Sequence, residues 1–329
     1  MLPRQKWTHR LALAVVVVTL LLPVTIGSLT TTLGAGMAFL DWPTSDGQNM
    51  LFYDMLRDIR LGNTDKVAEH GHRLAGMIVG LLSIPLAILG WRDGRAGVRM
   101  LTLGIVAGVI GQGVLGGARV LLDARTLAML HSLGAAVIVS LMGLTAVVTS
   151  RKWARAAEAT IRPGAGLATL TVITTVAVAV QFVAGGFVRH FGLALTEHLV
   201  GAVVVGVVSL VTAMMTVQGD SRELRAFGWG VFAAVLIQVM LGFGAWAGKF
   251  GLAALGIVAV ERGPFQVTLR TLHTTGGMVL LMAAVLLLVA VFQLRRSNAA
   301  SVPIEDMTSA SSTPLGRSSQ GVAVAGGIR

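Results

Sequence analysis

Eight apolar segments constrain what this chain can fold into more than any other feature. Each is close to the ~20 residues that a helix needs to cross a bilayer. The segments lie at 11–32, 72–91, 99–118, 127–149, 165–188, 194–217, 226–248 and 268–294. Because 54% of the residues are hydrophobic and only 12% are charged, the whole chain resembles polytopic membrane proteins in composition. The sequence therefore predicts an all-α integral membrane fold with eight transmembrane helices.

The distribution of basic residues predicts the topology. Most of the 26 lysines and arginines fall in the two termini and in the alternate loops that lie on the same side. Such segments face the cytoplasm, so we expect a multi-pass protein of the cell (inner) membrane with both termini cytoplasmic. Residues 34–69 then form one long outer loop, in which FYDMLRDIRLG is expected to be a short amphipathic helix at the interface. Residues 297–329 are expected to be a disordered cytoplasmic tail.

The absence of cysteine excludes several kinds of chemistry. Disulfides, thiolate metal sites, iron–sulfur clusters, cysteine nucleophiles and covalently attached c-type haem all require cysteine. The net charge of +11 does not indicate nucleic-acid binding, because no soluble basic domain is present to carry it. We expect membrane lipid around the chain and no nucleic-acid partner.

Four histidines recur in the apolar segments, each followed three or four residues later by a glycine. They are His72, His131, His198 and His273. Polar groups inside a bilayer are costly and usually face a bundle interior, where a lone histidine most often makes an interhelical hydrogen bond. Four in register instead predict two pairs on neighbouring helices, with glycine making room, that hold the iron of two haems. His9, His70 and His190 lie outside this pattern, and no role is assigned to them.

An internal repeat supports this interpretation. Segments three, five and seven each carry a glutamine, a glycine four residues later and a basic residue near the outer end. These sets are Gln112, Gly116 and Arg119; Gln181, Gly185 and Arg189; Gln238, Gly242 and Lys249. A histidine segment follows each one, and IGSLTTTLGAG in segment one is a divergent copy. The repeat predicts two pseudo-symmetric four-helix bundles, 1–162 and 163–296.

The glycines and basic residues of the repeat each allow a second interpretation. Glycines alone can serve close helix packing. The basic residues Arg119, Arg189 and Lys249, together with Arg73, can extend to the lipid headgroups. Our preferred interpretation is that they are candidates for binding haem propionates, as arginine–carboxylate pairs do.

One carboxylate distinguishes the two halves. Glu69 lies three residues before His72 and therefore on the same helical face. In the second half Glu197 directly precedes His198 and points about 100° away from it. We therefore expect a catalytic site with Glu69 as its acid or base in the first half, and an electron-transfer or structural haem in the second. The alternative is that Glu69 only complements the helix dipole near an N-terminus.

These residues carry a resemblance to a known family. GSLTTTLGAGMAFLDWPTSDG, the EHGHR motif at 69–73, LHSLGA, TEHLVGA and LRTLHTTGG are similar to stretches of the haem A synthases, membrane enzymes that convert haem O to haem A. The resemblance implies eight helices in two bundles. It also implies stepwise oxidation of a haem methyl group, through an alcohol, to a formyl group.

The resemblance further implies a division of the site residues. Glu69, His72 and His131 belong to the site that oxidises haem O, whereas His198 and His273 hold a haem b cofactor. The implied partners are haem O synthase, terminal oxidase assembly and an unidentified electron donor. Some members have two cysteines in the first outer loop; this chain has none, so a mechanism through those cysteines does not apply.

Two rival functions remain open. A di-haem b-type electron carrier acting on quinone would use the same four histidines, but it would place its haems nearer opposite faces of the membrane. A transporter would also explain the repeat, but it would need broken helices and polar groups at mid-bilayer, whereas the apolar runs are interrupted mainly by Pro23 and Pro85.

Overall fold

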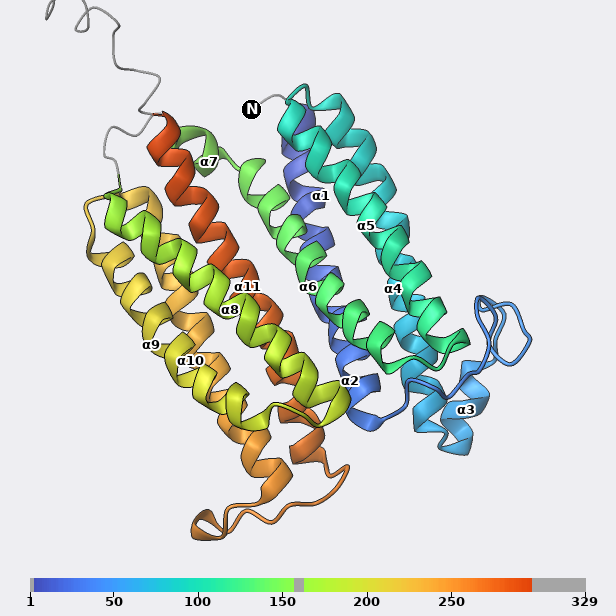
Figure 1. Cartoon of the computed structure of the whole chain (residues 1–329). Coiled ribbons are helices and arrows are strands. Elements are labelled where there is room, and N and C mark those ends of the chain that lie inside the picture. The colour runs from blue at the N-terminus through green and yellow to red at the C-terminus, as the bar shows by residue number, and fades with distance from the viewer. Residues whose placement is uncertain (1–2, 157–162, 298–329) are drawn as a thin grey trace, which may run out of the picture.

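The computed structural model describes residues 3–156 and 163–297, and these form a helical protein (Figure 1). Apart from two isolated bridges in loops, the described residues contain no β-structure. Eight helices are long and apolar enough to cross a membrane, which confirms the predicted number. The first comprises α1 (Pro3–Thr19), the π-helical turn η1 (Leu20–Val24) and α2 (Thr25–Leu33). The others are α4 (Thr64–Arg92), α5 (Ala96–Leu121), α6 (Arg125–Val148), α8 (Ala165–Phe191), α9 (Leu195–Gln218), α10 (Arg222–Phe250) and α11 (Pro264–Ser297).

Pro23 shapes the first membrane-spanning helix. Proline has no N–H to donate to the preceding turn, so an interruption is expected at this point. The chain widens into the π-helical turn η1, and the Thr25 hydroxyl donates to the Leu20 carbonyl at 2.7 Å. The helix then continues as α2, so the interruption exposes backbone carbonyls without ending the span.

The helices pack mainly with their neighbours along the chain. In the N-terminal half, α1 contacts α4 and α6, and α5 contacts α4 and α6. In the C-terminal half, α8 contacts α9 and α11, and α10 contacts α9 and α11. The halves meet through α6 against α8 and α11, and through α2 against α11 (Figure 1). The exact pseudo-symmetry of two bundles stays a prediction.

The loops and ends of the chain divide between the two ends of the molecule. The beginning of α1 and the end of α11 lie at the same end, as an even number of spans requires (Figure 1). The opposite end, here called the loop end, carries the loop 34–63 and the loop 251–263. The predicted amphipathic helix is present as α3 (Met55–Leu61), whose Leu56 and Ile59 are exposed. The predicted tail lies outside the described residues except for Ser297, which ends α11.

Candidate functional site

The four histidines lie in two pairs of nearly identical geometry. His72 of α4 and His131 of α6 have ring centres 6.0 Å apart and planes at 87°. His198 of α9 and His273 of α11 have ring centres 6.1 Å apart and planes at 79°. Each pair joins two helices that are not consecutive in the chain. The pairing expected from the sequence is therefore present in the fold.

Each ring lies against a glycine of a neighbouring helix. The glycines are Gly27 for His72, Gly116 for His131, Gly185 for His198 and Gly242 for His273. A Cβ added at these positions would approach the ring to 2.6, 3.2, 3.1 and 2.9 Å, closer than ordinary van der Waals contact. The glycines therefore make room for imidazoles and do not serve helix packing alone. The first of them, Gly27, is the counterpart that the divergent first copy of the repeat had obscured.

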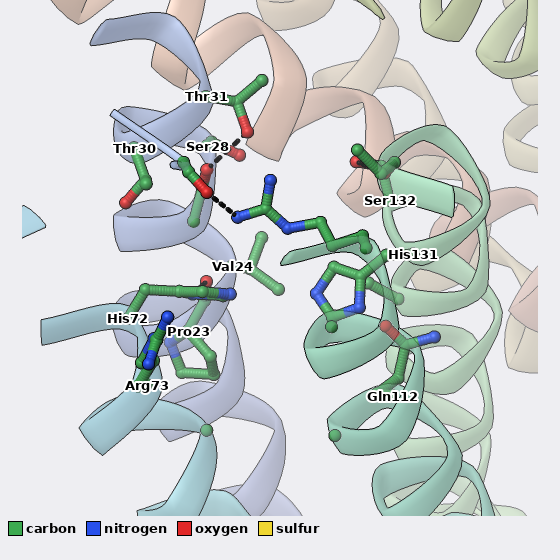
Figure 2. Close-up of a pocket in the computed structure, with 18 of the residues that line it drawn as sticks. Pro23, Val24, Ser28, Thr30, Thr31, His72, Arg73, Gln112, His131 and Ser132 are labelled. Carbon is green, nitrogen blue, oxygen red and sulfur yellow. Dashed lines mark hydrogen bonds between the residues drawn. The ribbon is translucent and has the colours of Figure 1, made fainter. Parts of the chain in front are cut away.

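A second contact orients three of the rings through Nδ1. The amide nitrogens of Gln181 and Gln238 lie 3.0 Å from Nδ1 of His198 and His273 respectively. In the first repeat Pro23 takes the place of glutamine, four residues before Gly27, and its carbonyl oxygen lies 2.9 Å from His72 Nδ1 (Figure 2). The Pro23 carbonyl accepts from the Nδ1–H of His72 and leaves Nε2 of that ring for a ligand, whereas the glutamine amide nitrogens donate and orient the other two rings.

The spacing of the rings fits a pair of axial ligands. An imidazole nitrogen binds a transition metal at about 2 Å and lies roughly 1 Å from the ring centre, so rings on opposite sides of one ion have centres about 6 Å apart. Among the described residues no group of three or more His, Cys, Asp or Glu could hold a metal ion. Haem iron does not need such a group, because the protein supplies only its axial ligands. The histidine pairs and their glycines thus fit haem.

A cavity of about 830 Å³ adjoins the N-terminal pair. This volume is within the range of small-molecule sites, ~300–1,000 Å³. Figure 2 shows His72 and His131 on different helices of its wall. Besides His72 and His131, the charged or titratable residues on the wall lie towards the loop end: Glu69, Arg73, Arg119, Asp123, Arg125, Arg189 and His190.

The other end of this cavity is apolar. We call the part lined by Gly80, Ile84, Val106, Ile110 and Met142 the deep limb. Ile84 lies twelve residues beyond His72 on α4, about 18 Å along the helix axis. The two hydroxyls that also line this part are used internally: Ser83 donates to the Gly80 carbonyl at 2.7 Å, and Thr19 to the Met142 sulfur at 3.3 Å. The cavity therefore suits an amphipathic ligand.

Glu69 lines the cavity but is held by the loop. Its side chain is almost fully buried. One carboxylate oxygen accepts from the backbone N–H groups of Ala38 at 2.7 Å and Phe39 at 3.2 Å, and the other accepts from Arg73 at 2.7 Å. Glu197, by contrast, is exposed on α9. The asymmetry of the two halves is present, and Glu69 has an anchoring contact that the sequence did not reveal.

Arg73 binds the same loop. Its guanidinium donates to the carbonyls of Asp41 at 3.0 Å and Thr44 at 2.7 Å, besides the bond to Glu69, and lies over the Phe39 ring. Most of its donors are thus committed to the protein. The propionate role expected for Arg73 stays a prediction, and the contacts favour loop anchoring.

Two other candidate cations, Arg119 and Arg189, both line the N-terminal cavity, although Arg189 comes from the C-terminal half. Arg119 lines the cavity and donates to the Gly36 carbonyl at 2.7 Å. Arg189 belongs to α8 but lines the N-terminal cavity, where it donates to the Ser28 carbonyl at 2.5 Å; it also donates to Thr274 at 2.6 Å, next to His273. Arg189 thus connects the surroundings of both histidine pairs.

Near the second pair, Lys249 stays a predicted propionate ligand, and Arg270 is a further candidate. Lys249 is exposed in the last turn of α10. Arg270, which the sequence analysis missed, is partly buried on α11, three residues before His273. The sequence contained a sign of Arg270, because it lies three residues before His273, just as Glu69 lies three residues before His72.

Three further cavity residues were missed. His190 of α8 reaches the cavity wall and lies 3.2 Å from the Ser132 hydroxyl. Arg125 begins α6 at the cavity wall. Trp42 of the loop lines the cavity and packs so closely on α5 that a Cβ at Gly117 would lie 2.3 Å from its indole. No local pattern marked them, because they come from different halves and from the loop.

Buried polar contacts fold the loop 34–63 against α4. His70 is almost fully buried, lies 3.2 Å from the Ser45 hydroxyl and packs against the Tyr53 ring. Hydrogen bonds from Asn63 at 2.8 Å and Tyr53 at 2.5 Å lower the pKa of Asp58 below its ordinary value. Burial, together with the neighbouring Asp58, raises the pKa of Tyr53. The loop therefore has its own buried polar core next to the cavity.

Comparison with known protein families gives a match over the N-terminal half and the start of the C-terminal half. Residues 9–196, more than half of the chain, match COX15-CtaA, described as cytochrome oxidase assembly protein. The chain belongs to this family. No curated protein matches the chain. The family match includes Glu69, His72 and His131 but ends before His198, so the second pair of this assembly protein rests on the internal repeat and on its matching geometry.

Proposed function

We propose that this cytochrome oxidase assembly protein is a haem A synthase, which oxidises a methyl group of haem O to a formyl group through a hydroxylated intermediate. One observation carries the proposal most directly. Two histidines 6.0 Å apart lie on the wall of a cavity with cationic residues at one end and an apolar limb at the other. Haem O has the matching parts: an iron, carboxylates and a long apolar tail.

The two histidine pairs have different roles in this proposal. His72 and His131 hold the iron of the substrate haem O, and His198 and His273 hold a resident haem b. When bound, haem b supplies one-electron redox chemistry that side chains cannot supply. The large cavity and the buried Glu69 adjoin the first pair, whereas the nearest acid to His198, Glu197, is exposed.

The cavity orients the substrate by its polarity. Arg119 at the loop end is suited to the haem carboxylates, because guanidinium–carboxylate pairs combine charge with directed hydrogen bonds. Arg189 is the second candidate, although it already donates to Ser28, Thr32 and Thr274. The deep limb is suited to the apolar tail. Trp42 and the loop cover one side of the cavity and restrict water around the reacting edge.

Glu69 is the proposed acid or base beside the haem methyl group. Conversion of a methyl group to an aldehyde removes four electrons and releases protons, so a proton acceptor is needed near the reacting carbon. The bonds from Ala38, Phe39 and Arg73 hold the Glu69 carboxylate in place. The electron partner is unidentified: if water supplies the formyl oxygen, an acceptor must take the four electrons, and if dioxygen supplies it, a donor must provide electrons. Haem O synthase and terminal oxidase assembly are the proposed partners, in an inner membrane with both termini cytoplasmic.

Pigment analysis tests the proposal. The protein is purified in detergent from cells that also make haem O, and its haems are extracted and identified by chromatography and mass. Haem b together with haem O, its hydroxylated form or haem A supports a synthase. Haem b alone, at two per chain, supports the di-haem electron carrier instead. Absence of haem refutes both. His9→Ala is the matched control, because His9 binds the Ala146 carbonyl away from both pairs.

A further inference from the structure

Arg189 makes hydrogen bonds to a close neighbour of each histidine pair. Its Nη1 donates to the Thr274 hydroxyl at 2.6 Å, and Thr274 directly follows His273 on α11. Its Nη2 donates to the Ser28 carbonyl at 2.5 Å and to the Thr32 hydroxyl at 3.1 Å, both on α2. One side chain from α8 therefore joins the helix that carries a ligand of the second pair to a helix that lies against the first pair.

The helix bound by Arg189 also orients His72. The Pro23 carbonyl, at the start of this half of the span, accepts from His72 Nδ1 at 2.9 Å (Figure 2). Gly27, which directly precedes Ser28, lies against the same ring. Because a Cβ at Gly27 would lie 2.6 Å from the ring, a small movement of α2 changes the space open to it. The position of α2 therefore decides how His72 is presented to the cavity.

The surroundings of Arg189 make its bonds costly to break. Ser28 and Thr32 are buried, and among the described residues no carboxylate pairs with Arg189. A guanidinium inside a membrane span without an ion-pair partner depends on neutral acceptors such as these. The Thr274 hydroxyl donates to the Arg270 carbonyl at 3.1 Å, so its oxygen is left to accept from Arg189. A movement that broke one of these bonds would leave a charged donor unpaired, so α2 and α11 are expected to move together.

This connection gives the C-terminal site an influence on the substrate site. Coordination of His273 fixes the turn of α11 that carries Thr274, and Arg189 passes that constraint to α2, which orients the ring of His72. Resting on the proposed function, we infer that Arg189 is a positioning residue that couples the two sites, so that occupancy of the C-terminal site strengthens binding of haem O in the N-terminal cavity. By linkage, haem O strengthens retention of haem b by the same factor. Substrate is then held firmly only by a protein that already contains its redox cofactor.

The affinity for haem O with the C-terminal site filled and empty tests this inference. Absorbance titrations of haem O are made in the detergent-purified protein and in His198→Ala, which lacks a ligand of the C-terminal haem on α9; each further variant is measured in both backgrounds. The filled form of the wild-type protein should bind haem O about tenfold more tightly than the empty form, within the usual range of coupling between sites. In Arg189→Gln the ratio of the two affinities should fall to about one. A ratio of one in the wild-type protein, or an unchanged ratio in Arg189→Gln, would overturn the inference.

Two adjacent threonines give a matched pair that leaves Arg189 in place. Thr274→Val removes an acceptor of Arg189, whereas Thr275→Val removes a buried hydroxyl that has no hydrogen-bond partner among the described residues. Thr274→Val should reduce the ratio about threefold or more, and Thr275→Val should keep the wild-type ratio. Equal effects of the two substitutions would overturn the inference, even if Arg189→Gln did not fold. The content and absorption spectrum of haem b serve as the folding control. Failure of the wild-type protein to bind haem O in either state would refute the proposed function itself, which is a separate outcome.

Discussion

Replacement of Gly27 by alanine tests the fit between glycine and histidine most sharply. The new methyl group would lie 2.6 Å from Cε1 and 2.8 Å from Nδ1 of His72. Carbon atoms pack best at about 3.5–4.0 Å, so the ring must retreat by roughly 1 Å. Overpacking of this kind costs about 1–3 kcal/mol. The same movement strains the hydrogen bond to Pro23, for which the net worth is about 1 kcal/mol.

A middle value of about 2 kcal/mol corresponds to a loss of roughly 30-fold in affinity for haem O. The assay is absorbance titration of haem O into the purified variant. Gly113→Ala is the control, because Gly113 also lines the cavity but a Cβ there meets nothing within 4 Å. Alanine should even stabilise that helix by up to about 1 kcal/mol. If Gly27→Ala binds haem O as tightly as Gly113→Ala does, the reasoning about the glycine contacts is refuted.

Three further predictions concern the loop and the deep limb. Glu69→Gln should keep haem bound while haem A production falls. Full production of haem A would remove Glu69 from the mechanism. An equal fall in Arg73→Gln, together with faster proteolysis of the loop 34–63, would show that Glu69 acts as an anchor of that loop. The pKa of Asp58 is lowered in the folded loop, so its contribution to stability is present above the unfolded pKa of about 4 and is lost as the pH falls through the folded value. Proteolysis of the loop 34–63 should therefore accelerate in that acid range. An unchanged pH dependence of proteolysis in Asp58→Asn would contradict this. Gly80→Leu should fill the deep limb and weaken binding of haem O about tenfold relative to haem b, because haem b has no long apolar tail. Equal weakening of both haems would argue that the deep limb does not bind the tail of haem O.

The membrane architecture could be predicted because it depends on local composition. A span needs enough consecutive apolar residues for the bilayer thickness, and every backbone group inside it must be paired within the helix. The helix ends were less predictable. The α4 helix begins at Thr64, eight residues before the apolar segment assigned from the sequence, because Asp65 and Lys66 continue the helix beyond the apolar region.

The site could be predicted in part. Four histidines, each with a glycine three or four residues later, identified both pairs, since spacing fixes which residues share a helical face. Gly27 was not recognised, because Pro23 replaces the glutamine that marks the other copies, and only the contact with His72 reveals the equivalence. Arg270 was overlooked although its position relative to His273 repeats that of Glu69.

The sequence by itself determined the number of spans, the pairing of the histidines and the presence of one extra carboxylate near His72, because helical periodicity and bilayer thickness act along the chain. Tertiary structure alone decided how that carboxylate is bound, because the Ala38 and Phe39 N–H groups reach Glu69 only when the loop folds back on α4. It also brought Arg189 and His190 from the C-terminal half to the N-terminal cavity. Such contacts depend on packing between helices far apart in the chain, which no local pattern encodes.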